Sequence, residues 1–164
     1  MKRAFIILFF PVLMFLIYSC ASTSEWKYGE NAIHIAIRSS PQLNLYKGNP
    51  HTLLLCVYQL RDPNAFNQLV DEDEGLSKLL ECSRFDPGVV SSRRLVIQPG
   101  KEISEVLDRS ESAKYVGFVA GYFNLNKEYV VRLTQIPLSF LKNPMPLKVD
   151  IYLGPQEILE FRGE

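Results

Sequence analysis

The stretch that decides the fold is residues 52–60, TLLLCVYQL. Nearly all of its side chains are apolar, which is typical of a central strand covered on both faces. Residues 114–123, KYVGFVAGYF, form a second long apolar strand. Gly117 and Gly121 lie inside it, where glycines often mark a bulge or a close approach to the backbone. Both stretches predict a core built from β-strands.

Apolar and polar residues alternate in several other segments, which predicts strands that bury one face. Residues 32–38, AIHIAIR, place three isoleucines on one face, and residues 147–153, LKVDIYL, alternate in the same way. Further strands are expected at residues 93–98, 103–107, 128–136 and 158–161. Seven or eight short strands separated by turn residues indicate an all-β fold with a small helical insertion, an antiparallel β-sandwich.

The helical insertion is expected after the second strand. Asp62 can accept backbone amides as an N-cap, and Pro63 suits the first helical position, with Phe66 on the apolar face. The acidic run at residues 71–74 could bind a cation, but it lacks EF-hand spacing, so a solvated helix edge is the favoured interpretation. A short helical turn is expected at residues 138–141.

Residues 1–20, MKRAFIILFFPVLMFLIYSC, have the build of a secretory signal, with Lys2 and Arg3 ahead of an apolar run. The run is shorter than the ~20 apolar residues of a membrane span. A small serine precedes Cys20, which predicts cleavage before this cysteine and acylation of it, although Tyr18 stands where such signals usually have a small residue. An ordinary cleaved signal or an uncleaved anchor helix remains the alternative.

Three parts are expected along the chain. Residues 1–19 form the signal peptide, residues 20–31 the lipidated N-terminus and a flexible tether, and residues 32–164 the β-sandwich domain. Ala21 rather than Asp follows the acylated cysteine, which implies transfer to the outer membrane in bacteria that sort lipoproteins by this position. The chain has 18 basic and 18 acidic residues, so loss of two basic residues with the signal leaves a slight acidic excess. Nucleic acid is therefore not expected as a partner.

No catalytic set is apparent. The only histidines are His34 and His51, and neither a His-x-x-x-His nor a Cys-x-x-Cys spacing occurs, so zinc is not expected. Carboxylates such as Asp62, Asp86 and Asp150 are scattered, whereas an active site needs convergent acid, base or metal groups. The favoured interpretation is a binding or scaffolding protein, not an enzyme, with no cofactor beyond a covalent lipid on Cys20.

Two cysteines remain if Cys20 is acylated. Cys56 lies in the central apolar strand and Cys82 follows the helical segment. An exported protein can form disulfides, so these two could be bridged. They could equally be buried thiols, because the sequence does not give the distance between their Cα atoms.

The loop at residues 39–51 is a candidate binding patch. Its prolines, asparagines and glycine predict a loop, yet it also carries Leu43, Leu45 and Tyr46, which could either contact a partner or pack on the sandwich. A second hypothesis is a small ligand or glycan on an exposed sheet face. The aromatic residues for that role would be Tyr115, Phe118, Tyr122 and Phe123, but core packing is favoured for them.

Several motifs together resemble the type VI secretion lipoprotein family, TssJ, also called SciN. They keep the family's order and span about residues 33–153. A signal ending in cysteine precedes the following segments, read in order: Leu43-Asn44, Gly48 and Pro50; Val57-Tyr58-Gln59-Leu60; Phe66; Pro99-Gly100; and Tyr115-Val116-Gly117-Phe118-Val119-Ala120.

The resemblance implies a transthyretin-like β-sandwich at the inner face of the outer membrane. It also implies binding to the periplasmic C-terminal domain of TssM, within a complex of TssJ, TssL and TssM. In the family the loop between the first two strands is implicated in this contact, and we expect Leu45 and Tyr46 at the interface and Leu43 in the core. Carried over to this sequence, the contact residues are Leu43, Asn44, Leu45, Tyr46, Lys47, Gly48, Asn49 and Pro50.

Overall fold

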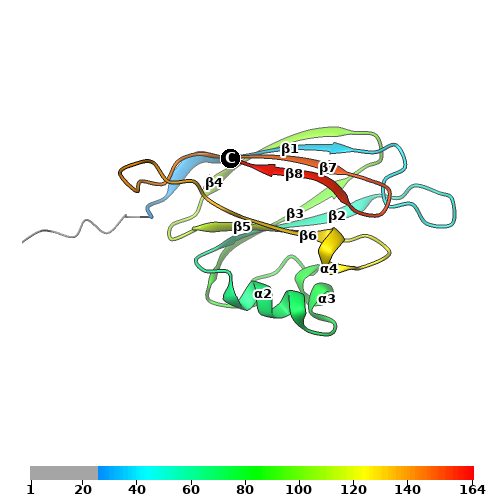
Figure 1. The fold of residues 1–164 in the computed structure, drawn as a ribbon, viewed down its shortest axis with the longest axis horizontal. Coiled ribbons are helices and arrows are strands. Elements are labelled where there is room, and N and C mark those ends of the chain that lie inside the picture. The colour runs from blue at the N-terminus through cyan, green and yellow to red at the C-terminus, as the bar shows by residue number, and fades with distance from the viewer. Residues whose placement is uncertain (1–25) are drawn as a thin grey trace, which may run out of the picture.

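The computed structural model describes residues 26–164 as a two-layered sandwich (Figure 1). The predicted signal peptide and acylated Cys20 lie outside these residues. In chain order the described elements are β1 (Gly29–Ser39), β2 (Leu53–Leu60), α2 (Asn64–Asp71), α3 (Gly75–Leu79), β3 (Val89–Ile97), β4 (Glu102–Arg109), β5 (Tyr115–Ala120), α4 (Lys127–Val130), β6 (Val131–Gln135), β7 (Leu147–Leu153) and β8 (Ile158–Gly163). The predicted β-rich fold with a small helical insertion is confirmed.

Each layer is a four-stranded sheet. One has the strand order β4-β1-β7-β8 and the other β3-β2-β5-β6. The pairings are antiparallel except between β1 and β7, which run parallel with Ile33 opposite Leu147 and Ser39 opposite Leu153. The prediction of an antiparallel sandwich is wrong at this pair, because β7 enters its sheet from the same end of the sandwich as β1.

The main core lies between the two sheets. Alternate residues of β1 and β7 face it, including Ile33, Ile35 and Ile37, while His34 between them is exposed as predicted. The second sheet contributes Leu55 and Val57 of β2 and corresponding residues of β5. Burying these aliphatic side chains is the dominant driving force for closing the two sheets on each other.

A second core covers the outer face of the sheet β3-β2-β5-β6. Its fully buried side chains include Tyr58 of β2 and Phe66 and Leu79 of the helices. Gly117 permits this packing, because a Cβ atom there would lie 2.9 Å from the ring of Phe66. β2 is apolar on both faces because each face lies against one of the two cores, as predicted for this strand. Gly117 marks a close approach to the backbone of β5, also as predicted.

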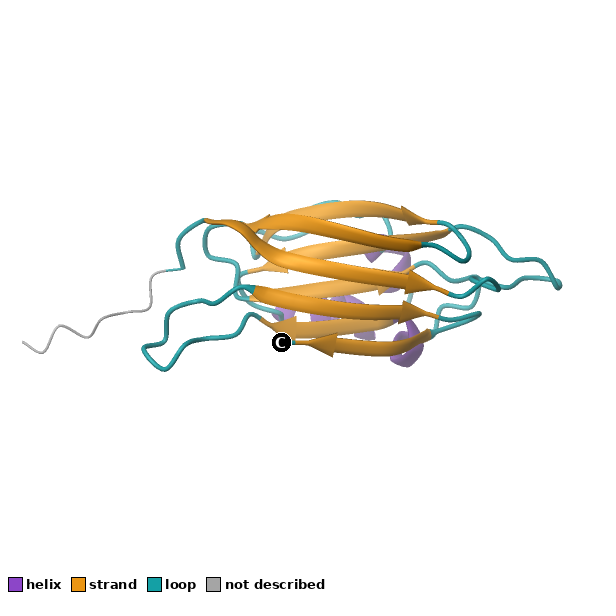
Figure 2. Cartoon of the chain, turned by 90° about the horizontal axis from the view of Figure 1, so that it is seen from above, coloured by secondary structure: helices purple, strands orange, loops and turns teal. Residues whose placement is uncertain are grey.

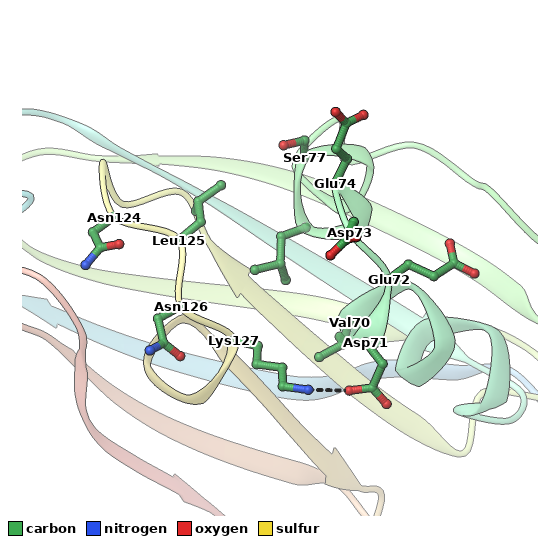
Figure 3. Close-up of a pocket in the computed structure, with 11 residues that line it drawn as sticks. Val70, Asp71, Glu72, Asp73, Glu74, Ser77, Asn124, Leu125, Asn126 and Lys127 are labelled. Atoms are coloured by element: carbon green, nitrogen blue, oxygen red, sulfur yellow. Dashed lines mark hydrogen bonds and ion pairs between the residues drawn. The ribbon is translucent and has the colours of Figure 1, made fainter.

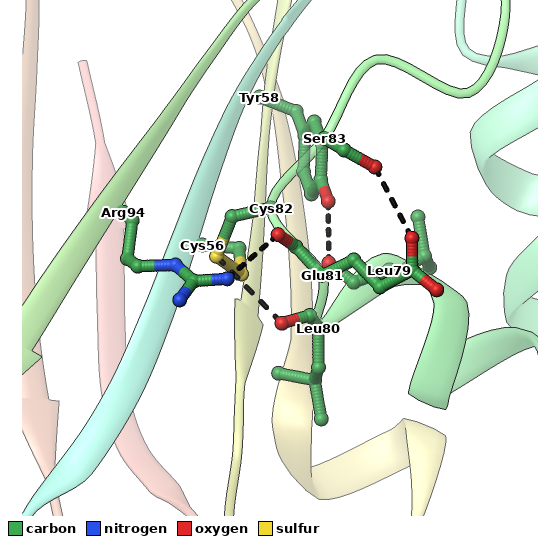
Figure 4. Close-up of a disulfide and its surroundings, with 8 residues drawn as sticks. All are labelled: Cys56, Tyr58, Leu79, Leu80, Glu81, Cys82, Ser83 and Arg94. Atoms are coloured by element: carbon green, nitrogen blue, oxygen red, sulfur yellow. Dashed lines mark hydrogen bonds between the residues drawn. A yellow bond between two sulfur atoms is a disulfide. The ribbon is translucent and has the colours of Figure 1, made fainter.

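A disulfide between Cys56 and Cys82 ties the helical insertion to β2 (Figure 4). The two Cα atoms are 5.2 Å apart, within the usual range for a bridge. The chain beside it is held as well: the Tyr58 hydroxyl donates to the Leu79 carbonyl, and Arg94 Nη2 donates to the Glu81 carbonyl at 2.8 Å. The disulfide and these hydrogen bonds therefore hold the helical insertion against the sheet β3-β2-β5-β6.

Several segments differ from the sequence-based expectation, and three of them change in kind. Residues 26–31, expected in the tether, belong to the folded domain, since β1 begins at Gly29 and Trp26 packs against the core. Residues 127–130, expected partly as strand, form the short helix α4, which Asn126 caps by accepting from the Glu128 amide at 3.1 Å. Residues 138–141 are a loop rather than a helical turn.

The sandwich has two ends (Figure 2). The end that we call the N-terminal end carries residues 26–28 and the loops 110–114 and 136–146. The opposite end, the loop end, carries the loops 40–52, 121–126 and 154–157. The candidate functional surface lies at the loop end.

Candidate partner-binding surface

The loop between β1 and β2 is anchored before it reaches its exposed tip. Leu43 is fully buried in the main core, and its carbonyl accepts from the His51 amide at 2.9 Å. The Leu45 amide donates to the Pro155 carbonyl at 2.8 Å, which joins this loop to the turn between β7 and β8. The loop therefore has a defined path rather than an adaptable one.

The tip of the loop is a tight turn. Tyr46 and Asn49 exchange both backbone hydrogen bonds, at 2.9 and 3.0 Å, across the central residues Lys47 and Gly48. Both central residues have positive φ, 49° and 78°, the signature of a type I′ hairpin turn. A glycine at the second position removes the strain that a side chain would bring. This turn displays Tyr46 and Lys47 outward.

Asn44 joins this loop to the one that follows β5. It is buried, its Nδ2 donates to the Thr52 carbonyl at 3.1 Å, and its Oδ1 accepts from the Phe123 amide at 2.9 Å. Asn44 and Phe123 are 79 residues apart in the sequence. Because a buried amide needs such partners, Asn44 fixes the relative position of the two loops.

Three aromatic side chains meet at this junction, and we call them the aromatic platform: Tyr46, His51 and Phe123. The rings of Tyr46 and Phe123 are stacked with centroids 4.4 Å apart, and His51 meets Phe123 edge-on at 5.0 Å. Tyr46 and Phe123 are nevertheless 44% and 55% exposed. A shallow cavity of about 170 Å³ adjoins them. Stacked rings left open to solvent are well suited to contact another protein.

The residues predicted for this surface divide into two groups. Leu43 and Asn44 are buried and hold the loop in place, while Leu45 is half-buried. The exposed residues are Tyr46, Lys47, Gly48, Asn49 and Pro50. Leu43 lies in the core, as expected. The expectation that Leu45 and Tyr46 lie at the partner interface stays a prediction, with Tyr46 exposed and Leu45 half-buried.

Phe123 is the residue that the sequence analysis placed wrongly. Phe118 and Tyr122 are buried, as core packing requires, but Phe123 is exposed. β5 is buried on both of its faces, so alternation along the strand does not predict the exposure of Phe123, which follows the strand in the loop 121–126. Its pairing with Tyr46 depends on the tertiary fold and has no local signal.

A second concave region lies beside the aromatic platform (Figure 3). It has a volume of about 530 Å³ between the α2–α3 connection and residues 124–127. The acidic run at residues 71–74 is exposed along its rim, and Lys127 Nζ lies 2.6 Å from Asp71 Oδ1. This carboxylate raises the pKa of the lysine. Within residues 26–164, no three His, Cys, Asp or Glu side chains are grouped to hold a metal ion.

Two side chains with shifted pKa values have structural roles. Burial raises the pKa of Tyr122, whose hydroxyl donates to the Glu157 carbonyl at 2.7 Å. Burial likewise lowers the pKa of Arg132, which donates to the Ile158 carbonyl at 2.8 Å. The carboxylate of Glu157 lies near both groups and acts to raise the pKa of each. The two hydrogen bonds hold the β7–β8 turn and the first residue of β8 in place.

The fold and this surface define a small β-sandwich protein with preformed loops at one end. The sequence matches the family T6SS-SciN, described as "Type VI secretion lipoprotein, VasD, EvfM, TssJ, VC_A0113", over residues 31–153. The chain belongs to this family of type VI secretion lipoproteins. Comparison with curated protein sequences gives no significant match. Within the described residues, no helix has the length and hydropathy of a membrane span.

Solved structures share the fold. The T6SS lipoprotein TssJ1 from Pseudomonas aeruginosa is 22% identical, with a TM-score of 0.64 over 84% of this chain and 96% of that one. Serratia marcescens Lip, a membrane-bound component of the type VI secretion system, is 18% identical, with a TM-score of 0.58 over 80% and 96%. A chain in the structure described as the T6SS protein TssM C-terminal domain (869-1107) from EAEC is 18% identical, with a TM-score of 0.56 over 78% and 97%.

Proposed function

We propose that this protein is an outer-membrane lipoprotein of the type VI secretion membrane complex that tethers the periplasmic C-terminal domain of TssM. Acyl chains on Cys20 hold it on the periplasmic face of the outer membrane. The aromatic platform and the exposed residues of loop 43–50 hold the partner. The observation that carries the proposal is membership of a secretion-lipoprotein family together with an exposed, preformed aromatic surface.

The geometry of the loop end supports a protein partner. Stacked Tyr46 and Phe123 offer two rigid apolar faces, and aromatic residues of this kind dominate binding energies at protein interfaces. The turn at Lys47 and Gly48 and the buried Asn44 hold the surface in one arrangement before binding. Such preorganisation lowers the ordering cost of association. The adjoining cavity of about 170 Å³ is smaller than the usual small-molecule site, which disfavours a ligand or glycan there.

The proposed role is mechanical and not enzymatic. It needs one end of the molecule to hold a membrane and the other to hold a partner, and no bond has to be made or broken. Stable anchoring requires more than one acyl chain, since a single chain gives only marginal membrane affinity.

The partner contact is tested by replacing both Tyr46 and Phe123 with Ala. The full mature protein is assayed for binding to the purified TssM periplasmic domain by calorimetry. We expect a loss of roughly 2 kcal/mol, about thirtyfold in affinity. The matched control is Tyr129→Ala, because Tyr129 is 45% exposed but lies outside the aromatic platform. Unchanged affinity in the folded double variant would reject this surface as the contact.

The membrane contact is tested by Cys20→Ser. We expect the variant in the soluble periplasmic fraction, whereas the unaltered protein sediments with outer membranes, because the acyl chains are lost with the thiol. Persistence of Cys20→Ser in outer-membrane fractions would contradict acyl anchoring. The two experiments are independent, so either half of the tether can fail alone.

A further inference from the structure

The loop between β6 and β7, residues 136–146, is a built hairpin. Ser139 and Lys142 close its tip: the Lys142 amide donates to the Ser139 carbonyl and the Ser139 amide to the Asn143 carbonyl, both at 2.8 Å. The Met145 amide donates to the Pro137 carbonyl at 2.8 Å, and Lys142 adopts a positive φ of 59°. These bonds give the tip a fixed conformation.

This hairpin presents apolar side chains to the outside. Phe140 is 100% exposed and Leu141 76%, and Leu138 and Met145 are also exposed. The loop, PLSFLKNPMP over residues 137–146, contains one basic residue, Lys142, and no acidic residue. A fixed loop that holds an aromatic and an aliphatic side chain away from its own core marks a contact with something apolar.

The hairpin lies at the N-terminal end of the sandwich. β1 and β7 are parallel and in register from Ile33 and Leu147, so the segment before β1 and the loop before β7 emerge side by side. Figure 1 shows the first described residues, in blue, and this orange loop at the same end. The loop end, with the aromatic platform, is at the far side.

Residues 26–28 are fastened to this end of the domain. The Trp26 carbonyl accepts from the Ser112 amide at 2.8 Å, and Arg109 Nη2 donates to the Lys27 carbonyl at 3.1 Å. The Tyr28 hydroxyl donates to Asp108. Cys20 and Trp26 are only six positions apart in the sequence, a reach of at most about 20 Å for a fully extended chain. An acylated Cys20 would therefore keep this end of the domain close to the bilayer.

From this juxtaposition we propose that the hairpin 136–146 is a second membrane contact, which inserts Phe140 and Leu141 among the phospholipids beside the anchor. The inference rests on the proposed acylation of Cys20. The occupant is a phospholipid surface because the apolar tip stands next to the anchored segment. The lone charge of the hairpin, Lys142, complements anionic headgroups. Aromatic and aliphatic side chains with a nearby lysine are the usual composition of an interfacial contact.

The hairpin adds orientation to anchoring. An acylated tether alone restricts the distance from the membrane but leaves the domain free to tilt. A second contact at the same end restricts the tilt, so the aromatic platform at the loop end points away from the bilayer. The partner then meets the platform without competition from the membrane surface.

The test uses tryptophan as a depth probe in the acylated mature protein, reconstituted into vesicles of phosphatidylethanolamine and phosphatidylglycerol. Trp26 is the only tryptophan, so the probe Phe140→Trp is placed in a Trp26→Phe background. The matched control is Val96→Trp in the same background, because Val96 is 62% exposed near the loop end. We expect a blue-shifted emission for Phe140→Trp and quenching by lipids brominated in their acyl chains, with neither change for Val96→Trp.

A second measurement removes the anchor. In the mature Cys20→Ser protein, weak binding to the same vesicles is expected to fall about tenfold when Phe140 and Leu141 are both replaced with Ser. Replacement of Val96 and Leu159, two exposed apolar residues elsewhere, is expected to leave it unchanged.

The outcomes separate the two proposals. Vesicle flotation of the acylated protein reports the anchor, and the Trp and Ser variants report the hairpin. If the acylated protein floats but Phe140→Trp keeps a water-like, unquenched emission, the hairpin proposal is overturned and the anchor stands. A blue shift that requires the TssM periplasmic domain and occurs without lipid would also overturn it, because the hairpin would then be a protein contact.

Discussion

The two outer faces of the sandwich differ in what covers them. The outer face of β3-β2-β5-β6 carries a second core under α2 and α3, with a disulfide beside it. The outer face of β4-β1-β7-β8, which we call the bare face, carries none of the described helices, and Figure 2 shows them behind the far sheet. On it Arg38 pairs with Glu160 at 3.2 Å, both side chains largely exposed. The sequence reflects this difference, because TLLLCVYQL is nearly all apolar whereas AIHIAIR alternates between apolar and polar or small residues.

The helices on the covered face also help to hold the loop end in place. The covered face brings α2 against the segment that follows β5, where Asp71 contacts Lys127. Phe123 of the aromatic platform lies in the same segment, four residues before Lys127. On the bare face, none of the described helices contributes in this way to the loop end. The second core therefore supports the sheet from which half of the platform projects, and damage to it should exceed any damage on the bare face.

The largest difference is expected from Phe66→Ala. Phe66 is fully buried in the second core and contacts Tyr58 edge-on at 5.9 Å, so its removal leaves a cavity. We expect a loss of about 3–5 kcal/mol in the free energy of unfolding, measured by urea titration. His34→Ala on the bare face should change it by less than about 0.5 kcal/mol. Equal effects of the two variants would refute the asymmetry between the faces.

Loss of the disulfide should come next. Cys56 and Cys82 enclose 26 residues, and a cross-link over a loop of this length stabilises by about 3 kcal/mol in the chain-entropy description. Replacing both with Ala should lower the urea midpoint accordingly. The control is the same titration of the unaltered protein with its disulfide reduced, which should give a similar midpoint. Full retention of the midpoint in either case would mean that the bridge contributes nothing.

A smaller effect is expected from Gly117→Ala. The added Cβ would meet the Phe66 ring at 2.9 Å, and overpacking of this kind costs about 1–3 kcal/mol. Combining it with Phe66→Leu, which withdraws the ring, should cost less than the sum of the two single changes. Strict additivity in this double-mutant cycle would show that the glycine is not needed for the helix to pack.

The smallest effect depends on pH. Burial, with the nearby Glu81 charge, raises the pKa of Tyr58 from 10.0 to about 12. The unfolded chain therefore releases this proton at lower pH than the folded one. The stability that Tyr58 contributes is complete below about pH 10 and is lost as the pH rises toward 12. Tyr58→Phe should flatten this alkaline decline in urea titrations, and an unchanged slope would contradict the assignment.

Local patterns were sufficient for most of the fold. Alternation located β7 at its observed bounds, and the apolar run 52–60 identified the doubly covered strand. Gly117 indicated that another group comes close to the backbone of β5, and that group is the ring of Phe66. These features depend on near neighbours in the chain and on the faces of single strands, which the sequence displays directly.

The remaining features depend on contacts between distant residues. The parallel direction of β1 and β7 and the bridge between Cys56 and Cys82 have no local pattern, so the sequence left them open or misread them. The same holds for the candidate site: the loop with Tyr46 was visible, but its stacking partner Phe123 was not. Because β5 is buried on both faces, alternation could not have shown that Phe123 is exposed.

The position of β1 has a consequence for how the protein matures. β1 lies next to the N-terminal segment, yet its neighbours in the sheet are β4 and β7, so its pairing waits for nearly the whole chain. Non-local pairings of this kind slow folding, because a long loop must close before they form. The first described strand of the chain is thus among the last to be secured. The isoleucines on its inner face stay uncovered until the strands that flank it have been made.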